Sequence, residues 1–201
     1  MHLGRTDAGV HSLGQVANFK IESNIEIEKI PMALNSKLKK SIVIKRAEEV
    51  EEKFHSRYNC KKKKYRYVIN NSRNGSSIYR DLEYHMPVKL NVEEMKKAIK
   101  YFEGEHDFKA FKSSGTSSKS SVRNIYEAKL LEENERIIIE LEGNGFLYNM
   151  VRIIVGTLVD VGLRKDKWTR HNKNNRIKRQ NKSRQNLATT WFVFNRSALL
   201  V

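Results

Sequence analysis

An aspartate surrounded by small residues lies near the start of the chain. The sequence Gly4-Arg5-Thr6-Asp7-Ala8-Gly9-Val10-His11 puts a carboxylate two residues after an arginine and four residues before a histidine. Glycine lets the backbone approach a ligand closely, and the small neighbours of Asp7 leave room for a planar group to reach it. A ligand can therefore reach the Asp7 carboxylate, and the alternative interpretation is an aspartate that serves as a cap or turn former.

A second chemical group lies within an apolar segment near the other end. Residues 148–159 are apolar nearly all round, which is typical of a buried helix, and Arg152 lies in the middle of them. A guanidinium keeps its proton, and an unpaired buried charge costs roughly several kcal/mol. Arg152 therefore needs a carboxylate partner, a path to the surface or a ligand phosphate. We favour pairing with an active-site acid.

Four lysines run directly into an aromatic strand. Residues 61–64 are all lysine, and in the strand that follows Tyr65, Tyr67 and Ile69 share one face. This combination is expected where phosphates are held electrostatically and a base stacks on a ring. The alternatives are a solvated lysine segment and a core role for Tyr65. The candidate RNA contacts are His11, Arg57, Lys61, Lys62, Lys63, Lys64 and Arg66.

Composition narrows the class of protein. The 201 residues carry 39 basic and 23 acidic side chains, a net charge of +16, which indicates a polyanionic partner such as nucleic acid. The single cysteine, Cys60, excludes a disulfide framework and a thiolate zinc site. No apolar run approaches membrane-spanning length, and the N-terminus lacks a signal-peptide pattern. We therefore expect a cytoplasmic protein.

Metal and nucleotide motifs are not apparent. The first glycines are not followed by the Gly-Lys-Ser/Thr of a Walker loop. His2, Asp7 and His11 could be imagined as metal ligands, but the chain offers no matching cluster with convincing spacing. His11 is better interpreted as a residue that orders its loop, and we expect no metal.

The residue pattern predicts alternating strands and helices. Helices are expected over 25–38, from an Asn91 cap to Gly104, and over 146–163. The segment from His106 through the serine-rich loop to Ser121 is expected to be exposed. Strands are expected over 13–21, 41–46, 61–69, 122–131 and 136–142.

The chain resembles the TruA-type tRNA pseudouridine synthases, which isomerise uridines in the anticodon arm of tRNA. Five stretches carry the resemblance, in the family's order, and the first and last of them are specific. They read GRTDAGVHSLGQVANF (4–19), FHSRYNCKKKKYRYVI (54–69), GEHDFKAF (104–111), SVRNIYEA (121–128) and GNGFLYNMVRIIVGTLVDVG (143–162).

The resemblance implies a role for four residues. Asp7 matches the family's catalytic aspartate, and Arg152 matches the arginine that pairs with it. Tyr65 matches the tyrosine that packs on the target base, and Arg5 matches an arginine expected near the RNA backbone. The enzyme would flip the uridine out of its stack, loosen the glycosidic bond through Asp7 and let the uracil rejoin the ribose through carbon. Whether Asp7 attacks the base or the sugar stays open.

The resemblance also implies the architecture. The family fold is α+β, with two ferredoxin-like or RRM-like halves whose antiparallel sheets join around a central cleft. Residues 1–57 would be the remainder of the first half with its catalytic loop, and 58–167 would be the second half. The family works as a homodimer on tRNA and needs no metal or organic cofactor.

Both ends of the chain depart from the family pattern. Family members carry further structure before the Gly-Arg-Thr-Asp motif, so we expect an N-terminal truncation. Residues 168–201 hold eight of the 39 basic residues and no acid, which leaves 31 basic against 23 acidic residues, a charge of +8, in the body. Permitted codons for this tail, read one base later, can spell the helix, DRTKAGKT loop and strand that the family has here. We therefore expect a frameshifted tail that is disordered or poorly packed.

Two alternatives to an active enzyme follow from these departures. One is a non-catalytic RNA-binding remnant that keeps the basic surface. The other is a fragment that does not fold, which would melt without cooperativity.

Overall fold

The computed structural model describes residues 2–3, 9–115, 120–163 and 193–198, with the backbone alone for the first and last of these segments. The described residues form two compact units. One consists of 2–3 and 16–59, and the other consists of 9–15, 60–115, 120–163 and 193–198.

The smaller unit has little regular structure. Strand β1 (His2–Leu3) pairs antiparallel with β3 (Ala17–Asn18), and a 3-10 turn, η1 (Ile27–Lys29), leads into the short helix α1 (Ile30–Asn35). The side chain of Asn18 ties β3 to a distant loop: its Nδ2 donates to the Phe54 carbonyl at 3.1 Å, and its Oδ1 accepts from the Ser56 N–H at 3.0 Å.

The prediction of a strand over 41–46 is wrong. The Asn35 side chain satisfies both backbone groups of Ile44, with Nδ2 donating to the carbonyl at 2.9 Å and Oδ1 accepting from the N–H at 2.8 Å. Ile42 and Val43 are 51% and 67% exposed, so their β-branched side chains have no sheet to pack on. Likewise the helix expected over 25–38 is restricted to η1 and α1, and the strand expected over 13–21 is broken into two short pieces.

The larger unit is built on one mixed sheet. Its strand order is β2-β9-β4-β8-β7-β6, with β5 paired to β4 off this path. The pairs β9–β4, β4–β8, β8–β7 and β7–β6 are antiparallel, whereas β2 is parallel to β9 and β5 is parallel to β4. The bounds are β2 (Ser12–Gly14), β4 (Lys62–Asn70), β5 (Tyr84–His85), β6 (Gly104–Asp107), β7 (Val122–Glu133), β8 (Arg136–Gly143) and β9 (Val193–Ala198).

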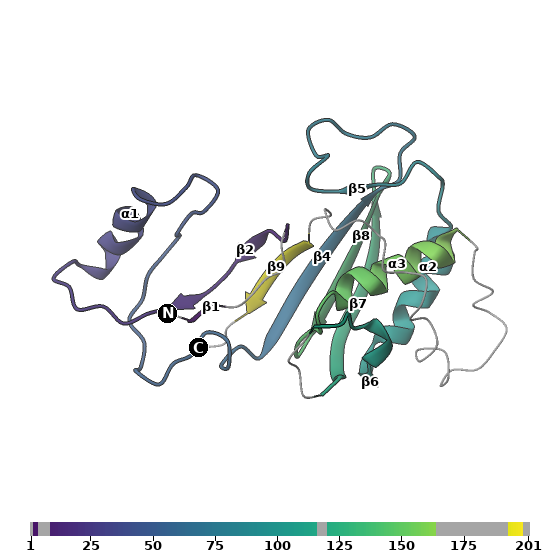
Figure 1. Cartoon of the computed structure of the whole chain (residues 1–201). Helices are drawn as coiled ribbons and strands as arrows, with labels where there is room; N and C mark the ends of the chain where they lie inside the picture. Colours follow the sequence, from purple (N-terminus) through teal and green to yellow (C-terminus); the bar gives the residue numbers. More distant parts are fainter. Residues whose placement is uncertain (1, 4–8, 116–119, 164–192, 199–201) are drawn as a thin grey trace. The chain divides into compact units, whose positions relative to one another are not determined.

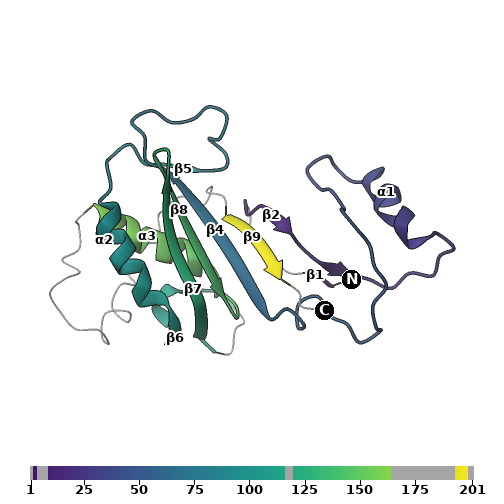
Figure 2. The same cartoon turned by 180° about the vertical axis from the view of Figure 1, so that it is seen from behind.

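Two helices cover one face of this sheet. Helices α2 (Val92–Ile99) and α3 (Met150–Gly162) lie on the same side of β4, β8 and β7 in both views (Figures 1 and 2). The core between the layers includes Ile69 from β4, Met95 from α2 and Ile154 from α3, all fully buried. The predicted apolar helix over 146–163 is confirmed, although it begins only at Met150, after Asn149 adopts a left-handed conformation.

Local signals in the sequence fix several element ends. The predicted Asn91 cap is confirmed, since its side chain accepts from the Glu94 N–H at 3.1 Å. The strands predicted over 122–131 and 136–142 are confirmed as β7 and β8. Their two-residue turn puts both Asn134 and Glu135 at positive φ, 45° and 62°, as in a type I′ hairpin.

The segment after α2 differs from expectation. The helix continues as a 3-10 turn, η2 (Lys100–Phe102), and Gly104 then opens β6 at a φ of +94°. Exposure was expected from His106 onward, yet Phe108 and Phe111 are fully buried and stack edge to face with ring centroids 6.0 Å apart. A further turn, η3 (Lys109–Phe111), brings them into the core.

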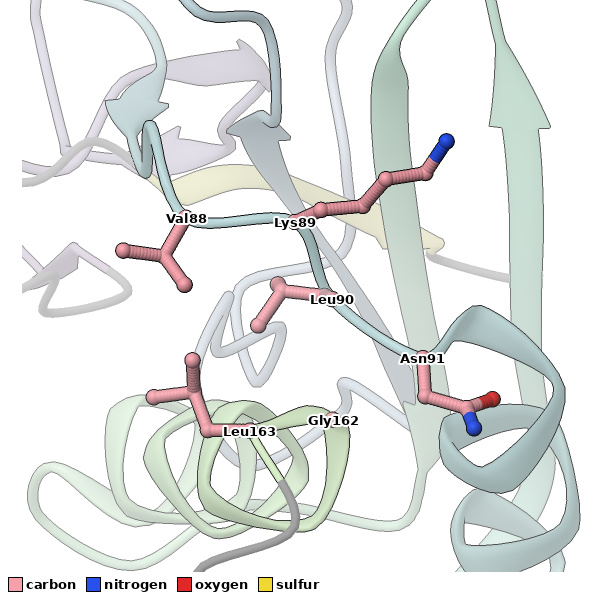
Figure 3. A pocket seen from close by; sticks show the side chains of 6 residues that line it. All are labelled: Val88, Lys89, Leu90, Asn91, Gly162 and Leu163. Atoms are coloured by element: carbon pink, nitrogen blue, oxygen red, sulfur yellow. The ribbon is translucent and has the colours of Figure 1, made fainter.

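The end of α3 meets the start of α2 at a close junction. The Asn91 N–H donates to the Gly162 carbonyl at 2.9 Å, and a Cβ on Gly162 would lie 2.7 Å from the Met95 sulfur. A surface pocket opens beside this junction, with Leu90 and Leu163 facing one another across it (Figure 3). A larger residue at 162 would therefore require the Met95 and Leu90 side chains to shift.

The tail expected to be disordered is described only over Val193–Ala198. Its backbone forms β9 and is paired on both edges, with β4 on one side and β2 on the other. That the tail over 168–201 is disordered or poorly packed stays a prediction. No helix in the described part of the chain is long and apolar enough to cross a membrane.

Candidate active site

Two of the predicted site residues, Asp7 and Arg5, lie outside the described residues. The described part of the candidate site consists of the side chains around Tyr65 and Arg152. Both belong to the larger unit, Tyr65 in β4 and Arg152 in α3.

Tyr65 lies on the helix-covered face of β4. Strand alternation puts it on the same face as Tyr67 and Ile69, which are buried in the core, while Tyr65 itself is half-buried. The rings of Tyr65 and Phe146 pack edge to face, with centroids 5.0 Å apart and planes inclined by 78°. This contact fixes the tyrosine ring and leaves part of it accessible to a ligand.

Arg152 is half-buried on the first turns of α3. Burial raises the pKa of the Tyr67 phenol far above its ordinary value, the positive charge of Arg152 opposes that rise, and Tyr84 adds to it. The guanidinium is thus close enough to the inner face of β4 for its charge to act on a side chain there. Arg152 and the Tyr65–Phe146 pair belong to one side of one sheet.

The opposite face of β4 carries a ladder of ion pairs. Lys62 Nζ lies 2.8 Å from Glu142, while Lys64 Nζ lies 2.7 Å from Glu140 and Arg66 Nη2 lies 2.6 Å from it. The side chain of Glu140 is only 8% exposed. Burial works against its ionisation, but the hydrogen bonds and charges of its two cations outweigh burial and lower the pKa of this carboxyl.

The remaining candidate RNA contacts are divided between the two units. In the larger unit His11 and Lys61 are exposed and Lys63 is half-buried. In the smaller unit Arg57 is exposed and lies over the Tyr58 ring, 5.8 Å from its centroid. Tyr58 is itself 77% exposed, so this aromatic ring and its cation are open to a partner.

One cation near the site, Arg123, was not among the residues predicted from the sequence. Arg123 on β7 is half-buried, and burial lowers its pKa. Its Nη1 donates to the carbonyls of Ser120 and Val122 at 3.1 and 2.6 Å, and its Nε lies 3.7 Å from where a Cβ on Gly145 would be. Gly145 directly precedes Phe146. The signal was present, because Arg123 lies within the SVRNIYEA stretch.

Neither of two described pockets holds these residues. One lies in the smaller unit among Lys20, Glu51, Glu52 and Lys53, and the other lies at the helix junction described above. Within the described residues, no three His, Cys, Asp or Glu side chains are grouped to hold a metal ion. Among the described residues, the candidate site consists of Arg152, the two tyrosines of β4 and the cations around them.

Comparison with known proteins identifies the family. A sequence model of the family described as tRNA pseudouridine synthase matches residues 3–59 and 98–190. The chain belongs to the tRNA pseudouridine synthase family. Arg123, Phe146 and Arg152 fall within the matched ranges, whereas the site residues of β4, Tyr65 among them, lie between the two ranges.

Curated relatives agree with the family assignment. The chain is 52% identical over 163 residues to tRNA pseudouridine synthase A of Thermoanaerobacter sp. (strain X514), covering 81% of this chain and 67% of that protein. It is 53% identical over 162 residues to the protein of the same name from Ruminiclostridium cellulolyticum, covering 80% and 66%. It is 50% identical over 163 residues to tRNA pseudouridine synthase A 2 of Clostridium perfringens, covering 81% and 67%. The chain thus spans about two thirds of the length of these relatives.

Proposed function

We propose that the chain isomerises uridine to pseudouridine in the anticodon stem-loop of tRNA. The observation that carries this proposal is the position of Arg152, whose half-buried guanidinium emerges from the apolar helix α3 on the side of the sheet that bears Tyr65 and Phe146. A cation in this setting favours an ionised carboxylate beside it, and an accessible aromatic ring offers a surface for a base.

The proposed reaction begins with extrusion of the target uridine. Unstacking costs about a few kcal/mol, which packing on Tyr65 and contacts to the phosphates would offset. Asp7 acts as the nucleophile, held ionised and oriented by Arg152; the bond that its carboxylate forms with the sugar or the base breaks again before the product leaves, so the carboxylate is regenerated. The bond between C1′ and N1 breaks, the uracil turns while it stays against Tyr65, and C1′ bonds to C5. The C5 proton is released and N1 gains a proton, so no atom is added to the product.

The architecture expected for the family belongs to the same proposal. It consists of two ferredoxin-like halves, 1–57 and 58–167, around a cleft, with two copies of the chain forming a homodimer. Sedimentation equilibrium of the purified chain tests the dimer, since a monomer at micromolar concentration would contradict it.

The test of the activity uses an unmodified tRNA transcript labelled with tritium at C5 of uridine. Wild-type chain should release tritium, because C5 loses its hydrogen when the new bond forms. Asp7→Asn should lose turnover while its affinity for the transcript, measured by filter binding, stays within about threefold, a change of less than 1 kcal/mol. Retained release by Asp7→Asn would reject the nucleophile. Binding by the wild-type chain without any release would instead support the RNA-binding remnant.

A further inference from the structure

The four consecutive lysines do not all face the same way. In a strand, neighbouring side chains point to opposite faces, so Lys63 shares the face of Tyr65 while Lys62 and Lys64 share the face of Arg66. The buried positions of Tyr67 and Ile69 identify the face of Tyr65 as the one covered by α3. A run that reads as one basic block in the sequence is therefore two sets of charges.

The charges on the outer face already have partners within the sheet. Lys62 is paired with Glu142, and Lys64 shares Glu140 with Arg66. In the register of β4 against β8, Arg66 lies directly opposite Glu140 and Lys64 lies directly opposite Glu142. Lys64 therefore reaches Glu140 diagonally, and Lys62 reaches Glu142 in the same way. Moving one of these ammonium groups to a phosphate would require breaking its ion pair, and in the case of Glu140 would deprive a nearly buried carboxylate of a cation.

Lys63 is half-buried like its two neighbours, but unlike them it forms no ion pair among the described residues. The residue opposite it on β8 is Gly143, which has no side chain to occupy the space beside it. A Cβ at Gly143 would lie 2.6 Å from the Asn124 carbonyl oxygen, so the close backbone contact with β7 favours glycine here and no side chain stands opposite Lys63.

The distance from Lys63 to the aromatic ring suits one nucleotide. Two residues along a strand span about 6.6 Å, and a lysine side chain is long and flexible at its end. A base packed on Tyr65 carries its own phosphates, which would lie within reach of an ammonium on the same face. We propose that Lys63 is a positioning residue that binds a phosphate next to the extruded nucleotide, whereas Lys62 and Lys64 stabilise the sheet. This inference rests on the proposed function for the identity of the RNA.

The experiment measures how the affinity for an unmodified tRNA transcript depends on salt. Each phosphate contact contributes about 0.7 to 0.9 to the slope of log Kd against log salt concentration. Lys63→Gln should lower this slope by about that amount and weaken binding several-fold at low salt. Lys63→Arg should restore both. Lys129→Gln is the matched control, since Lys129 lies on the outer face of β7 and is paired with Glu127, and the variant loses the same single charge.

The comparison with Lys62→Gln decides the proposal. A slope near the wild-type value for Lys62→Gln and Lys129→Gln, together with the lower slope for Lys63→Gln, supports it. Equal slopes for Lys62→Gln and Lys63→Gln would overturn it. Thermal melts of all variants show whether each is folded. If Lys63→Gln does not fold, Lys63→Met supplies a second neutral side chain at this position.

The outcome is separable from that of the proposed function. Tritium release by the wild-type chain and its loss in Asp7→Asn test the reaction, whereas the salt slopes test only the lysine contact. In turnover assays Lys63→Gln should raise KM and leave kcat nearly unchanged, because a phosphate away from the reacting bond is bound equally in ground and transition states. A fall in kcat alone would contradict the phosphate contact.

Discussion

Tyr65 and Phe146 form an edge-to-face pair with ring centroids 5.0 Å apart, although 80 positions separate them in the sequence. Tyr65 comes from the middle strand of the sheet, and Phe146 comes from the turn that leads into α3. The pair therefore links the strand that carries the proposed base-packing ring to the helix that carries Arg152.

Replacement of Tyr65 tests the role of its ring. Tyr65→Leu should lower kcat/KM by about 5- to 150-fold, because stacking of a base on an aromatic side chain contributes about 1–3 kcal/mol. Tyr65→Phe keeps the ring and should retain most of the binding of RNA. Phe146→Leu is the matched control, since it removes the neighbouring ring and should cost less activity. Equal losses in Tyr65→Leu and Phe146→Leu would mean that the pair is only structural.

Replacement of Arg152 separates its charge from its shape. Arg152→Met should lower kcat by at least about 100-fold, since the neutral side chain no longer favours an ionised carboxylate; the size corresponds to about 3 kcal/mol. Arg152→Lys keeps the charge but loses the planar guanidinium, so its kcat should lie between that of Arg152→Met and that of the wild type. Full activity of Arg152→Met in the tritium assay would contradict the assignment. Thermal melts should show a folded protein for both, because α3 is apolar around this position.

The outer-face ion pairs predict a pH-dependent contribution to stability. The pKa of Glu140 is lowered in the folded protein, so its stabilising effect is present at neutral pH and is lost as pH falls through the folded pKa. Glu140→Gln leaves Lys64 and Arg66 without this carboxylate and should cost about 1–3 kcal/mol at pH 7. Urea unfolding of both proteins should show this difference shrinking as the pH falls below the ordinary range for glutamate. A difference that stays constant with pH would contradict the charge pairing.

Gly143 offers a test of the sheet geometry. A Cβ at this position would lie 2.6 Å from the Asn124 carbonyl oxygen, and this neighbour is backbone that cannot rotate away. Gly143→Ala should therefore lower the free energy of unfolding by about 1–3 kcal/mol. Gly145→Ala is the control two residues later, where the nearest atom belongs to the flexible Arg123 side chain at 3.7 Å. Urea denaturation should show a much smaller change for Gly145→Ala than for Gly143→Ala.

Short-range patterns were sufficient for several elements. The Asn91 cap, the strands on either side of the Asn134–Glu135 turn and the apolar helix around Arg152 depend on neighbours within a few positions. Their propensities and periodicity are therefore visible in the sequence alone. The same holds for the two faces of β4, since alternation is a property of any strand. Motifs within 4–162 were also enough to indicate the family.

Long-range partners could not be inferred in this way. Residues 41–46 have strand propensity, but the Asn35 side chain takes the backbone groups that a neighbouring strand would need. Phe108 and Phe111 sit in a polar stretch, yet contacts with distant elements bury them.

The sequence by itself determined the family, the candidate residues and the periodicity of the strand that bears Tyr65. Only the tertiary structure decided which lysines are held by Glu140 and Glu142, and which one stands beside Gly143 on the face of Tyr65. The physical reason is that strand register pairs residues about 80 positions apart, and a charge acquires its partner only when that register is formed.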